Sequence, residues 1–228
     1  MSTAAPVSFH HANDIPRSDP GKVPALVERM RAIVGPAGIL THKADLSVYE
    51  CDGFTIEKNK PDVVVFPTTT EEVVQIVKAC NALDVPFMAR GAGTSLAGGC
   101  VPVGGGVMIA LSRMKKILEV NVRDRYAVVE AGVVNVWLTN QIKPHGYHYA
   151  PDPSSQGACT IGGNVATNSG GPHTLKYGVT VNHVIGVEMV LPDGTVAVCG
   201  GPCDDGPGYD LTGVIVGSEG TFGIVTKT

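Results

Sequence analysis

A glycine-rich stretch from Met88 to Gly99 limits what this 228-residue chain can fold into more than any other feature of its sequence. It follows a short apolar run, Val85–Ala89, that is typical of a β-strand. Its glycines remove side chains where the backbone turns sharply or approaches another group closely. Consecutive backbone N–H groups in such a turn form an anion site, to which Thr94, Ser95 and Arg90 add donors. The stretch therefore favours a phosphate or pyrophosphate, although an ordinary glycine-rich loop between strands has the same composition.

Two common phosphate-binding loops do not match this stretch. The dinucleotide loop of the Rossmann fold has Gly at its first, third and sixth positions, but the sixth position counted from Gly91 is Leu96. The P-loop ends in Gly-Lys-Ser or Gly-Lys-Thr, and no lysine occurs between Lys78 and Lys115. The anion site, if present, is therefore of another kind.

Composition and charge exclude several classes of protein. The hydrophobic content of 43% is enough for one large domain or two packed lobes. The net charge is −4 and no basic cluster occurs, so nucleic acid is not expected as a partner. The apolar runs are far shorter than a membrane span. Residues 1–19 have no apolar centre, so we expect a flexible N-terminal tail rather than a signal peptide.

The six cysteines do not form a recognisable metal or disulfide pattern. Only Cys199 and Cys203 lie close together in the sequence, and no second pair or histidine partner completes four metal ligands. We therefore expect no metal site, and reduced thiols in a cytoplasmic protein. A chain of this length needs no disulfides to hold its core.

Residues 61–89 predict a strand–helix–strand unit that leads into the glycine-rich stretch. Val63–Phe66 is a buried strand by composition, Thr68–Glu72 offers helix-capping and acidic residues, and the helix runs to Leu83. The strand at Val85–Ala89 is expected to run parallel to the first. Further strands are expected at 106–111, 117–121, 127–130, 184–191, 195–198 and 222–225, helices at 20–34 and 133–142, and either element at 210–216. Strands outnumber helices, so the predicted class is α+β and not a doubly wound sheet.

Two more glycine-rich stretches carry polar but uncharged side chains. The first covers Pro151–Gln156 and Thr160–Gly171, where Asp-Pro and paired glycines predict an irregular backbone. Its Thr, Asn and Ser side chains suit a large flat ligand that needs amide, carbonyl and hydroxyl contacts. The second, Gly217–Thr226, places glycines before a strand whose backbone could pair with a planar ring system.

Four of these segments occur in the order seen in one known family. The chain resembles the FAD-binding domain of the vanillyl-alcohol oxidase/p-cresol methylhydroxylase (PCMH) superfamily, above all its glycolate oxidase and D-lactate dehydrogenase flavoproteins. The resemblance covers Pro20–Thr228, and Glu50–Gly53 and His173–Gly178 add to it. The four segments that carry it are Arg90–Ser95, Pro151–Pro153, Thr160–Asn164 and Gly217–Thr221.

The resemblance implies two α+β lobes, residues 20–111 and 112–228, with FAD lying extended between them and a substrate-cap domain absent from this chain. The pyrophosphate would be held by Arg90, Gly91, Ala92, Gly93, Thr94 and Ser95, with Gly98 nearby. The adenine and ribose end would be lined by Pro67, Glu219, Gly220, Gly223, Ile224 and Val225. The ribityl chain and isoalloxazine would be approached by Pro151, Asp152, Pro153, Thr160, Gly162, Gly163, Asn164, Ala166 and Thr167.

One position departs from a subset of that superfamily. Covalently flavinylated relatives often carry a histidine where this chain has Thr94. Threonine cannot form the histidyl–flavin bond, so we expect FAD to be bound non-covalently.

The resemblance implies an oxidoreductase that oxidises a small 2-hydroxy acid, glycolate or D-lactate, by hydride transfer to flavin N5. The family carries its carboxylate-binding Arg and proton-handling His groups largely in the cap domain, so this chain alone is expected to be inactive. His173 is the one local catalytic candidate, with a structural role as the alternative. Other readings are a stand-alone FAD-binding or electron-relay subunit, and a cell-wall sugar-nucleotide reductase, which fits the loops less well. The resemblance also suggests an iron–sulfur partner subunit, through which the protein could lie at the inner membrane.

Overall fold

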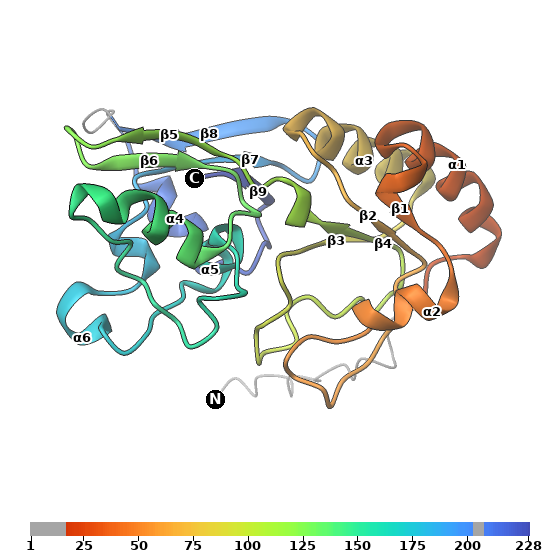
Figure 1. Cartoon of the computed structure of the whole chain (residues 1–228). Coiled ribbons are helices and arrows are strands. Elements are labelled where there is room, and N and C mark those ends of the chain that lie inside the picture. The colour runs from red at the N-terminus through yellow and green to blue at the C-terminus, as the bar shows by residue number, and fades with distance from the viewer. Residues whose placement is uncertain (1–16, 203–207) are drawn as a thin grey trace, which may run out of the picture.

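The computed structural model describes residues 17–202 and 208–228, and within them the chain forms two α+β lobes (Figure 1). A four-stranded sheet lies within residues 39–110, and a two-stranded and a three-stranded sheet lie within residues 117–227. This confirms the predicted α+β class. None of the helices in the described part of the chain combines the length and the apolar character needed to cross a membrane.

The first sheet has the strand order β1-β2-β4-β3. β2 (Val63–Val65) and β3 (Phe87–Arg90) are both parallel to β4 (Val107–Ala110), as expected for strands joined by a helical crossover. They are therefore parallel to each other, as predicted, but β4 lies between them. The sequence did not indicate β1 (Ile39–Leu40), which pairs antiparallel with β2.

Helices cover both faces of this sheet. α1 (Val23–Val34) and α3 (Thr70–Leu83) lie on one face, and the short α2 (Lys43–Leu46) lies on the other (Figure 1). The Thr69 hydroxyl accepts a hydrogen bond from the Glu72 amide at 3.2 Å, so α3 begins with a side-chain cap. Side chains of successive residues on a strand point to opposite faces. Accordingly Val63, Val65, Val107 and Ile109 pack against Leu26 and Met30 of α1 and Val73 and Ile76 of α3. On the other face, Val64, Met108 and Ala110 pack against Leu46 of α2.

The second lobe is built on five strands. The three-stranded order is β8-β7-β9, and β5 pairs with β6. Val129 and Thr228 exchange backbone hydrogen bonds of 2.8 and 2.9 Å, which joins β6 to β9 in one continuous surface. The strands are β5 Ile117–Asn121, β6 Tyr126–Val129, β7 Gly186–Val190, β8 Val196–Gly200 and β9 Ile224–Lys227.

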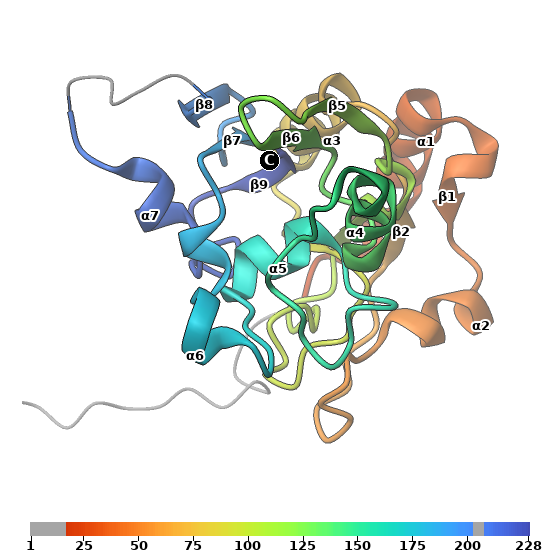
Figure 2. The same cartoon turned by 60° about the vertical axis from the view of Figure 1, so that its left-hand side comes forward.

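The helices of the second lobe include two that the sequence did not indicate. α4 (Asn135–Ile142) and α5 (Ile161–Thr167) lie together on one side of this sheet, and α6 (Thr174–Tyr177) lies beyond them (Figure 2). α7 (Leu211–Ile215) shows that the ambiguous segment 210–216 is helical. Neither α5 nor α6 was predicted.

α5 corrects the expectation of an irregular backbone at residues 160–171. Thr160 caps the helix by accepting a hydrogen bond from the Gly163 amide at 3.3 Å. Its glycines serve packing: a β-carbon on Gly162 would lie 2.6 Å from the β-carbon of Ala131. Low intrinsic helix propensity is thus outweighed by a close tertiary approach that only glycine permits.

The two lobes share a core and a polar junction. Val190 and Ile224 of the second lobe pack into the main core of the first. The Thr70 hydroxyl donates to Glu188 at 2.7 Å, and Glu188 also accepts from the ammonium group of Lys227 at 2.9 Å. Burial alone would raise the pKa of Glu188, but these hydrogen bonds outweigh it and hold the pKa below its ordinary value. The carboxylate is therefore stabilised as a charged link between the lobes.

The beginning of the described chain is attached to the first lobe. Residues 1–16 of the expected tail lie outside the described residues. The last three residues that we assigned to the tail, however, make contacts. The Ser18 amide donates to the Gly104 carbonyl at 2.9 Å, and Arg17 donates to the Lys60 carbonyl at 2.8 Å.

Candidate functional site

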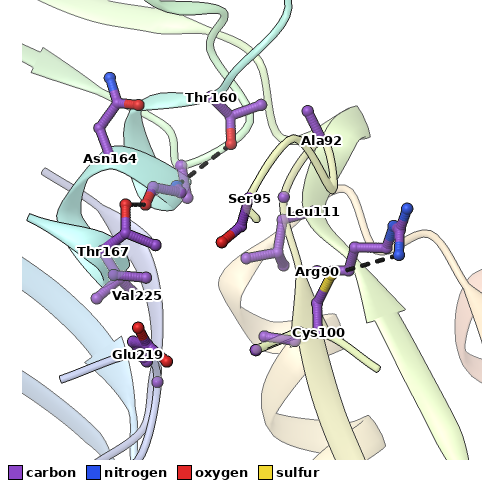
Figure 3. A pocket seen from close by; sticks show the side chains of 18 of the residues that line it. Arg90, Ala92, Ser95, Cys100, Leu111, Thr160, Asn164, Thr167, Glu219 and Val225 are labelled. Atoms are coloured by element: carbon purple, nitrogen blue, oxygen red, sulfur yellow. Dashed lines mark hydrogen bonds between the residues drawn. The ribbon is translucent and has the colours of Figure 1, made fainter. Parts of the chain in front are cut away.

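A cavity of about 270 Å³ lies between the two lobes and brings together the three glycine-rich stretches. One wall is the loop that follows β3, the second is the beginning of α5, and the third is β9 with the loop before it (Figure 3). A neighbouring cavity of about 210 Å³ shares Ala89, Gly220, Gly223 and Ile224 with it. The two form one elongated depression, which suits a long ligand.

The loop after β3 offers free backbone donors. Within the part of the chain that the structure describes, the amides of Ala92, Gly93, Thr94 and Ser95 donate to no protein acceptor. Gly93 has a φ of +70°, which turns the chain at a conformation that favours glycine. The Ser95 hydroxyl points from the loop toward the opposite wall (Figure 3). Such a set of donors without a nearby protein acceptor is suited to a phosphate or pyrophosphate.

The wall formed by α5 is polar and uncharged. Thr160, Asn164 and Thr167 all line the cavity. Asn164 is only 1% exposed, and neither its carboxamide oxygen nor its nitrogen has a hydrogen-bond partner among the described residues. An unpaired buried amide is costly, so a ligand or ordered water is expected to satisfy it. The Thr167 hydroxyl lies 2.8 Å from the Ser169 hydroxyl, at the edge of the same wall.

The third wall, formed by β9 and the loop before it, lies close to the loop after β3. Glu219 has a φ of +52° and projects toward Gly99, where a β-carbon would lie 3.2 Å from its carboxylate. Gly223 packs tightly on β7, since a β-carbon there would lie 2.6 Å from the Val190 carbonyl oxygen. This wall therefore combines one carboxylate acceptor with a flat, side-chain-poor strand end.

Most of the predicted cofactor-binding residues meet at this cavity. Those that line it are Arg90, Gly91, Ala92, Gly93, Thr94, Ser95, Thr160, Gly162, Gly163, Asn164, Ala166, Thr167, Glu219, Gly220, Gly223, Ile224 and Val225. Five others do not line it: Pro67, Gly98, Pro151, Asp152 and Pro153.

Those five positions have structural contacts instead. Pro67 is buried at the end of β2. The Pro151 carbonyl accepts a hydrogen bond from Asn135 at 2.9 Å, and the Gly98 amide donates to Asp52 at 3.0 Å. These contacts support the loops that form the walls.

Further lining residues escaped the sequence analysis. Ser155 and Ser169 belong to the stretch Pro151–Gly171 and Ser218 belongs to Gly217–Thr226, so their polarity offered a signal, and Ala89 and Gly99 belong to Met88–Gly99. The remainder, which carry no such signal, are Cys100, Leu111, Ala131, Cys159 and Ile215. They reach the cavity because strand ends and helices meet there.

The Arg90 side chain points away from the α5 wall (Figure 3). Its guanidinium donates to the Cys51 carbonyl at 2.8 Å and to the Cys100 sulfur at 3.3 Å, and it lies 5.4 Å from the centre of the Tyr49 ring. Arg90 is 8% exposed, and these contacts of its guanidinium all lie within the first lobe.

The ionisable residues of the cavity are few. Burial raises the pKa of the Cys100 thiol, although the Arg90 charge opposes that shift. Burial likewise raises the pKa of the Cys159 thiol. Both thiols are therefore poor nucleophiles at neutral pH. Within residues 17–202 and 208–228, no group of three His, Cys, Asp or Glu side chains is placed to hold a metal ion, and Cys203 lies outside the described residues.

His173 does not line the cavity. Its Nδ1 is hydrogen-bonded to the Asp152 carboxylate, and its side chain is 65% exposed. Its ring also lies 6.5 Å from the Tyr177 ring. The His183 ring nitrogen is hydrogen-bonded to the Tyr177 carbonyl at 2.9 Å, and the His148 ring packs edge-on against the Tyr177 ring. All three histidines therefore make local contacts around α6, and the catalytic role of His173 stays a prediction.

Comparison with known proteins agrees with this geometry. A model of the FAD binding domain family matches residues 61–200. The glycolate oxidase subunit GlcD of Escherichia coli is 44% identical over 189 residues, covering 83% of this chain and 38% of that protein. A D-lactate dehydrogenase of Anaerostipes hadrus is 38% identical over 206 residues, covering 90% of this chain and 43% of that protein. The chain therefore spans about two fifths of the length of these relatives.

Solved structures share the fold over nearly the whole chain. An alkyldihydroxyacetonephosphate synthase superposes with a TM-score of 0.80 at 26% identity, covering 96% of this chain and 42% of that one. A substrate complex of p-cresol methylhydroxylase superposes with a TM-score of 0.71 at 26% identity, covering 93% and 44%. The second similarity confirms the predicted PCMH-type fold. The chain belongs to the FAD-binding domain family, and FAD is its cofactor.

Proposed function

We propose that this chain binds FAD in an extended conformation between its lobes, as part of an oxidoreductase that oxidises glycolate, D-lactate or a similar 2-hydroxy acid. The observation that carries the proposal is the loop after β3, whose amides donate to no protein acceptor and whose residues line the interlobe cavity. The names of the relatives, a glycolate oxidase subunit and a D-lactate dehydrogenase, support the substrate class.

The residues of the first wall fit the pyrophosphate of FAD. Gly91 keeps the cavity side of the loop free of a side chain, since a β-carbon there would lie 2.7 Å from the Thr160 hydroxyl. A β-carbon on Gly93 would instead collide with the Arg90 guanidinium. The unpaired amides of Ala92–Ser95 would donate to phosphate oxygens, and the Ser95 hydroxyl adds a further donor. These neutral donors supply the electrostatic complement that the pyrophosphate requires.

The second wall fits the flavin end of the cofactor. Thr160, Asn164 and Thr167 provide hydroxyl and carboxamide groups that match the polar edge and the ribityl hydroxyls of a flavin. The Asn164 carboxamide has both an unused donor and an unused acceptor, but it is buried and points away from the opposite wall, so a contact with the flavin requires its side chain to turn. At the third wall, the Glu219 carboxylate is suited to accept hydrogen bonds from ribose hydroxyls, and Ile224 and Val225 offer apolar surface beside it.

FAD, when bound, supplies the hydride acceptor that no side chain of the chain can replace. The residues of this chain hold and orient it and exclude water from the space between the lobes. Arg90, Cys100, Cys159 and Glu219 are the ionisable residues that line the cavity. Glu219 is the one carboxylate among them, and we assign it to the ribose hydroxyls of the adenylate half rather than to the substrate hydroxyl. We therefore place proton removal and recognition of the acid's carboxylate in a cap domain. His173, whose side chain is exposed beside Asp152, stays the candidate within this chain for a contact with the substrate.

The word subunit in the name of the E. coli relative supports a multi-subunit assembly. We extend the proposal to an iron–sulfur partner that receives the electrons, and to a cytoplasmic protein that reaches the inner membrane through such partners.

The test is a titration of the purified chain with FAD, followed by flavin fluorescence and by the visible spectrum. We expect saturation near one FAD per chain, competition by ADP, and weaker binding of FMN, which lacks the adenylate half. Addition of D-lactate or glycolate should leave the flavin oxidised. Absence of FAD binding would refute the cofactor site, and bleaching by either acid would show that this chain carries the catalytic groups itself.

A further inference from the structure

We propose that Arg90 and Asp52 are positioning residues that hold the loop Gly91–Cys100 in its FAD-binding conformation by joining it to the segment Cys51–Gly53. The proposal rests on the proposed function, because it assumes that this loop binds the pyrophosphate. Neither Asp52 nor the other residues of that segment line the cavity. Their effect on the cofactor is therefore exerted through the loop.

Arg90 connects the two ends of the loop to the segment. Its Nη1 donates to the Cys51 carbonyl at 2.8 Å and to the Cys100 sulfur at 3.3 Å. The guanidinium also lies over the Tyr49 ring at 5.4 Å. Arg90 directly precedes the loop and Cys100 is its last residue. The planar guanidinium of Arg90 therefore holds both ends of the loop beside the Cys51 carbonyl.

Asp52 makes the corresponding connection with its carboxylate. One oxygen accepts from the Phe54 amide at 2.8 Å, which closes a turn in the segment, and the other accepts from the Gly98 amide at 3.0 Å. Asp52 is 5% exposed, so water competes little for these two bonds. A single carboxylate thus sets the shape of the segment and attaches the loop to it.

The contact at Gly53 explains how the segment orients the binding amides. The Gly53 amide donates to the Gly93 carbonyl at 3.1 Å. In a trans peptide the carbonyl of one residue and the N–H of the next point in opposite directions. Holding the Gly93 carbonyl toward the segment therefore turns the Thr94 N–H away from it, to the side where Thr94 lines the cavity. Gly53 also has to be glycine, since a β-carbon there would lie 2.8 Å from the Ser95 carbonyl oxygen.

The competing explanation is that Arg90 binds the pyrophosphate by its charge. Substitution to lysine separates the two explanations, because lysine keeps the charge but loses the planar fork that contacts Cys51 and Cys100 together. The dissociation constant of FAD is measured by flavin fluorescence for wild type, Arg90→Lys, Arg90→Ala, Asp52→Asn and the Arg90→Lys/Asp52→Asn double variant, at low and high salt. Asp52→Asn replaces one acceptor by an N–H group that faces a backbone N–H.

Two substitutions in the same lobe serve as matched controls. Arg113 donates to the Ala37 carbonyl at 2.6 Å and lies 5.1 Å from the centre of the Phe66 ring, which repeats the chemistry of Arg90 outside the cavity lining. Asp62 accepts from the Gly106 amide at 2.6 Å, which repeats that of Asp52. Arg113→Lys and Asp62→Asn are expected to lower the melting temperature about as much as the test variants, while leaving FAD affinity unchanged.

We expect Arg90→Lys and Asp52→Asn each to weaken FAD binding about tenfold or more, the size expected for loss of a charge-assisted hydrogen bond. Their effects should be less than additive in the double variant, since both act on one loop. The salt dependence of binding should stay that of wild type, because no phosphate contact is removed. Wild-type FAD affinity in both Arg90→Lys and Asp52→Asn would overturn the proposal. It would also be overturned if Arg90→Lys bound FAD with wild-type affinity while FAD binding by Arg90→Ala depended less on salt than in wild type, since Arg90 would then act through its charge.

A measurement on the unmodified protein covers the case in which a variant fails to fold. Hydrogen exchange of FAD-free wild type should show slow exchange at the Gly53 and Gly98 amides, because both are bonded before the cofactor arrives. Fast exchange at both, with protection appearing only on addition of FAD, would overturn the positioning role. Absence of FAD binding by wild type would instead refute the proposed function, so the two failures are distinguishable.

Discussion

Gly91 and Thr160 meet across the interlobe cavity so closely that a β-carbon on Gly91 would lie 2.7 Å from the Thr160 hydroxyl oxygen. The hydroxyl also caps α5, so it cannot move away without losing the bond from the Gly163 amide. Gly91→Ala should therefore weaken FAD binding, by about 1–3 kcal/mol if the cost resembles that of other small-to-large changes in packed sites. Equilibrium titration with FAD measures it. Gly157→Ala is the control, since no atom lies within 4 Å of its β-carbon position. Equal affinity in the two variants would contradict the site.

Because position 94 is threonine and not histidine, we expect the flavin to leave the protein on denaturation. A hydroxyl at this position cannot form a histidyl link to the flavin, so we expect the cofactor to be held by non-covalent contacts. Acid precipitation of FAD-loaded protein should leave the yellow colour in the supernatant, as recorded by its visible spectrum. Flavin retained in the washed pellet would show a covalent bond to some other residue.

Cys100 offers a second readout of the site that needs no substitution. It lines the cavity, whereas Cys199 lies on β8 away from it, and both are partly exposed. Because the pKa of Cys100 is raised, the alkylation is carried out at alkaline pH. Bound FAD should then slow alkylation of Cys100 several-fold and leave that of Cys199 unchanged, as followed by mass spectrometry. Cys80 should resist alkylation with or without FAD, because burial raises its pKa to about 12. Alkylation of Cys100 at the same rate in both states would argue against FAD in this cavity.

Glu188 makes the junction between the lobes sensitive to acid. Its pKa is lowered in the folded protein, where hydrogen bonds from Thr70, Lys227 and Thr226 outweigh the effect of burial. Its contribution is therefore present above the ordinary value of 4.5 and is lost as the pH falls through the lowered pKa. The stability difference between wild type and Glu188→Gln should be largest near neutral pH and should shrink below about pH 4.5. Urea unfolding at several pH values measures it.

The comparison for that experiment is Glu50→Gln. Glu50 also faces two ammonium groups, those of Lys58 and Lys60, at 3.7 Å, but all three lie in the first lobe and the lysines are half-exposed. An exposed pair contributes little to stability. A pH dependence of Glu188→Gln no larger than that of Glu50→Gln would show that the junction does not depend on the charge.

Gly162 sets helix propensity against packing. Alanine in α5 would gain up to about 1 kcal/mol from its higher helix propensity. Its β-carbon would, however, lie 2.6 Å from that of Ala131, and forcing a methyl group into a packed contact costs about 1–3 kcal/mol. We therefore expect Gly162→Ala to lower the melting temperature, with Gly157→Ala near wild type. A raised melting temperature would mean that the helix shifts freely on Ala131.

The sequence predicted those parts of the fold that local patterning determines. Val63–Val65 is apolar on both faces and forms a buried strand, and Thr69 with its acidic neighbours begins α3. The loop from Gly91 was identified because closely spaced glycines with neighbouring hydroxyl residues suit an anion site, although an ordinary loop has the same composition. Most residues of the four segments that carry the family resemblance line one cavity in the structure. Their roles toward FAD stay predictions.

Features that depend on distant partners were not accessible in this way. The paired glycines of α5 indicate a loop until Ala131 is placed against them. Leu111 and Cys159 line the cavity because of where their neighbours are packed, and apolar character alone does not distinguish them from core residues. The direction of the Arg90 side chain follows from the position of the Cys51 carbonyl, which no pattern in the sequence reveals.

The packing of Val190 and Ile224 among first-lobe side chains has a consequence for how the cofactor enters. Swinging the lobes apart would expose that shared apolar surface to water, at a cost that grows with the area uncovered. We therefore expect FAD to enter a cavity that is already formed, rather than to bind through a hinge motion that separates the two lobes. The shared core also means that we expect the two lobes to unfold together. Replacing one lobe by an unrelated one during evolution would therefore require changes in the core of the other.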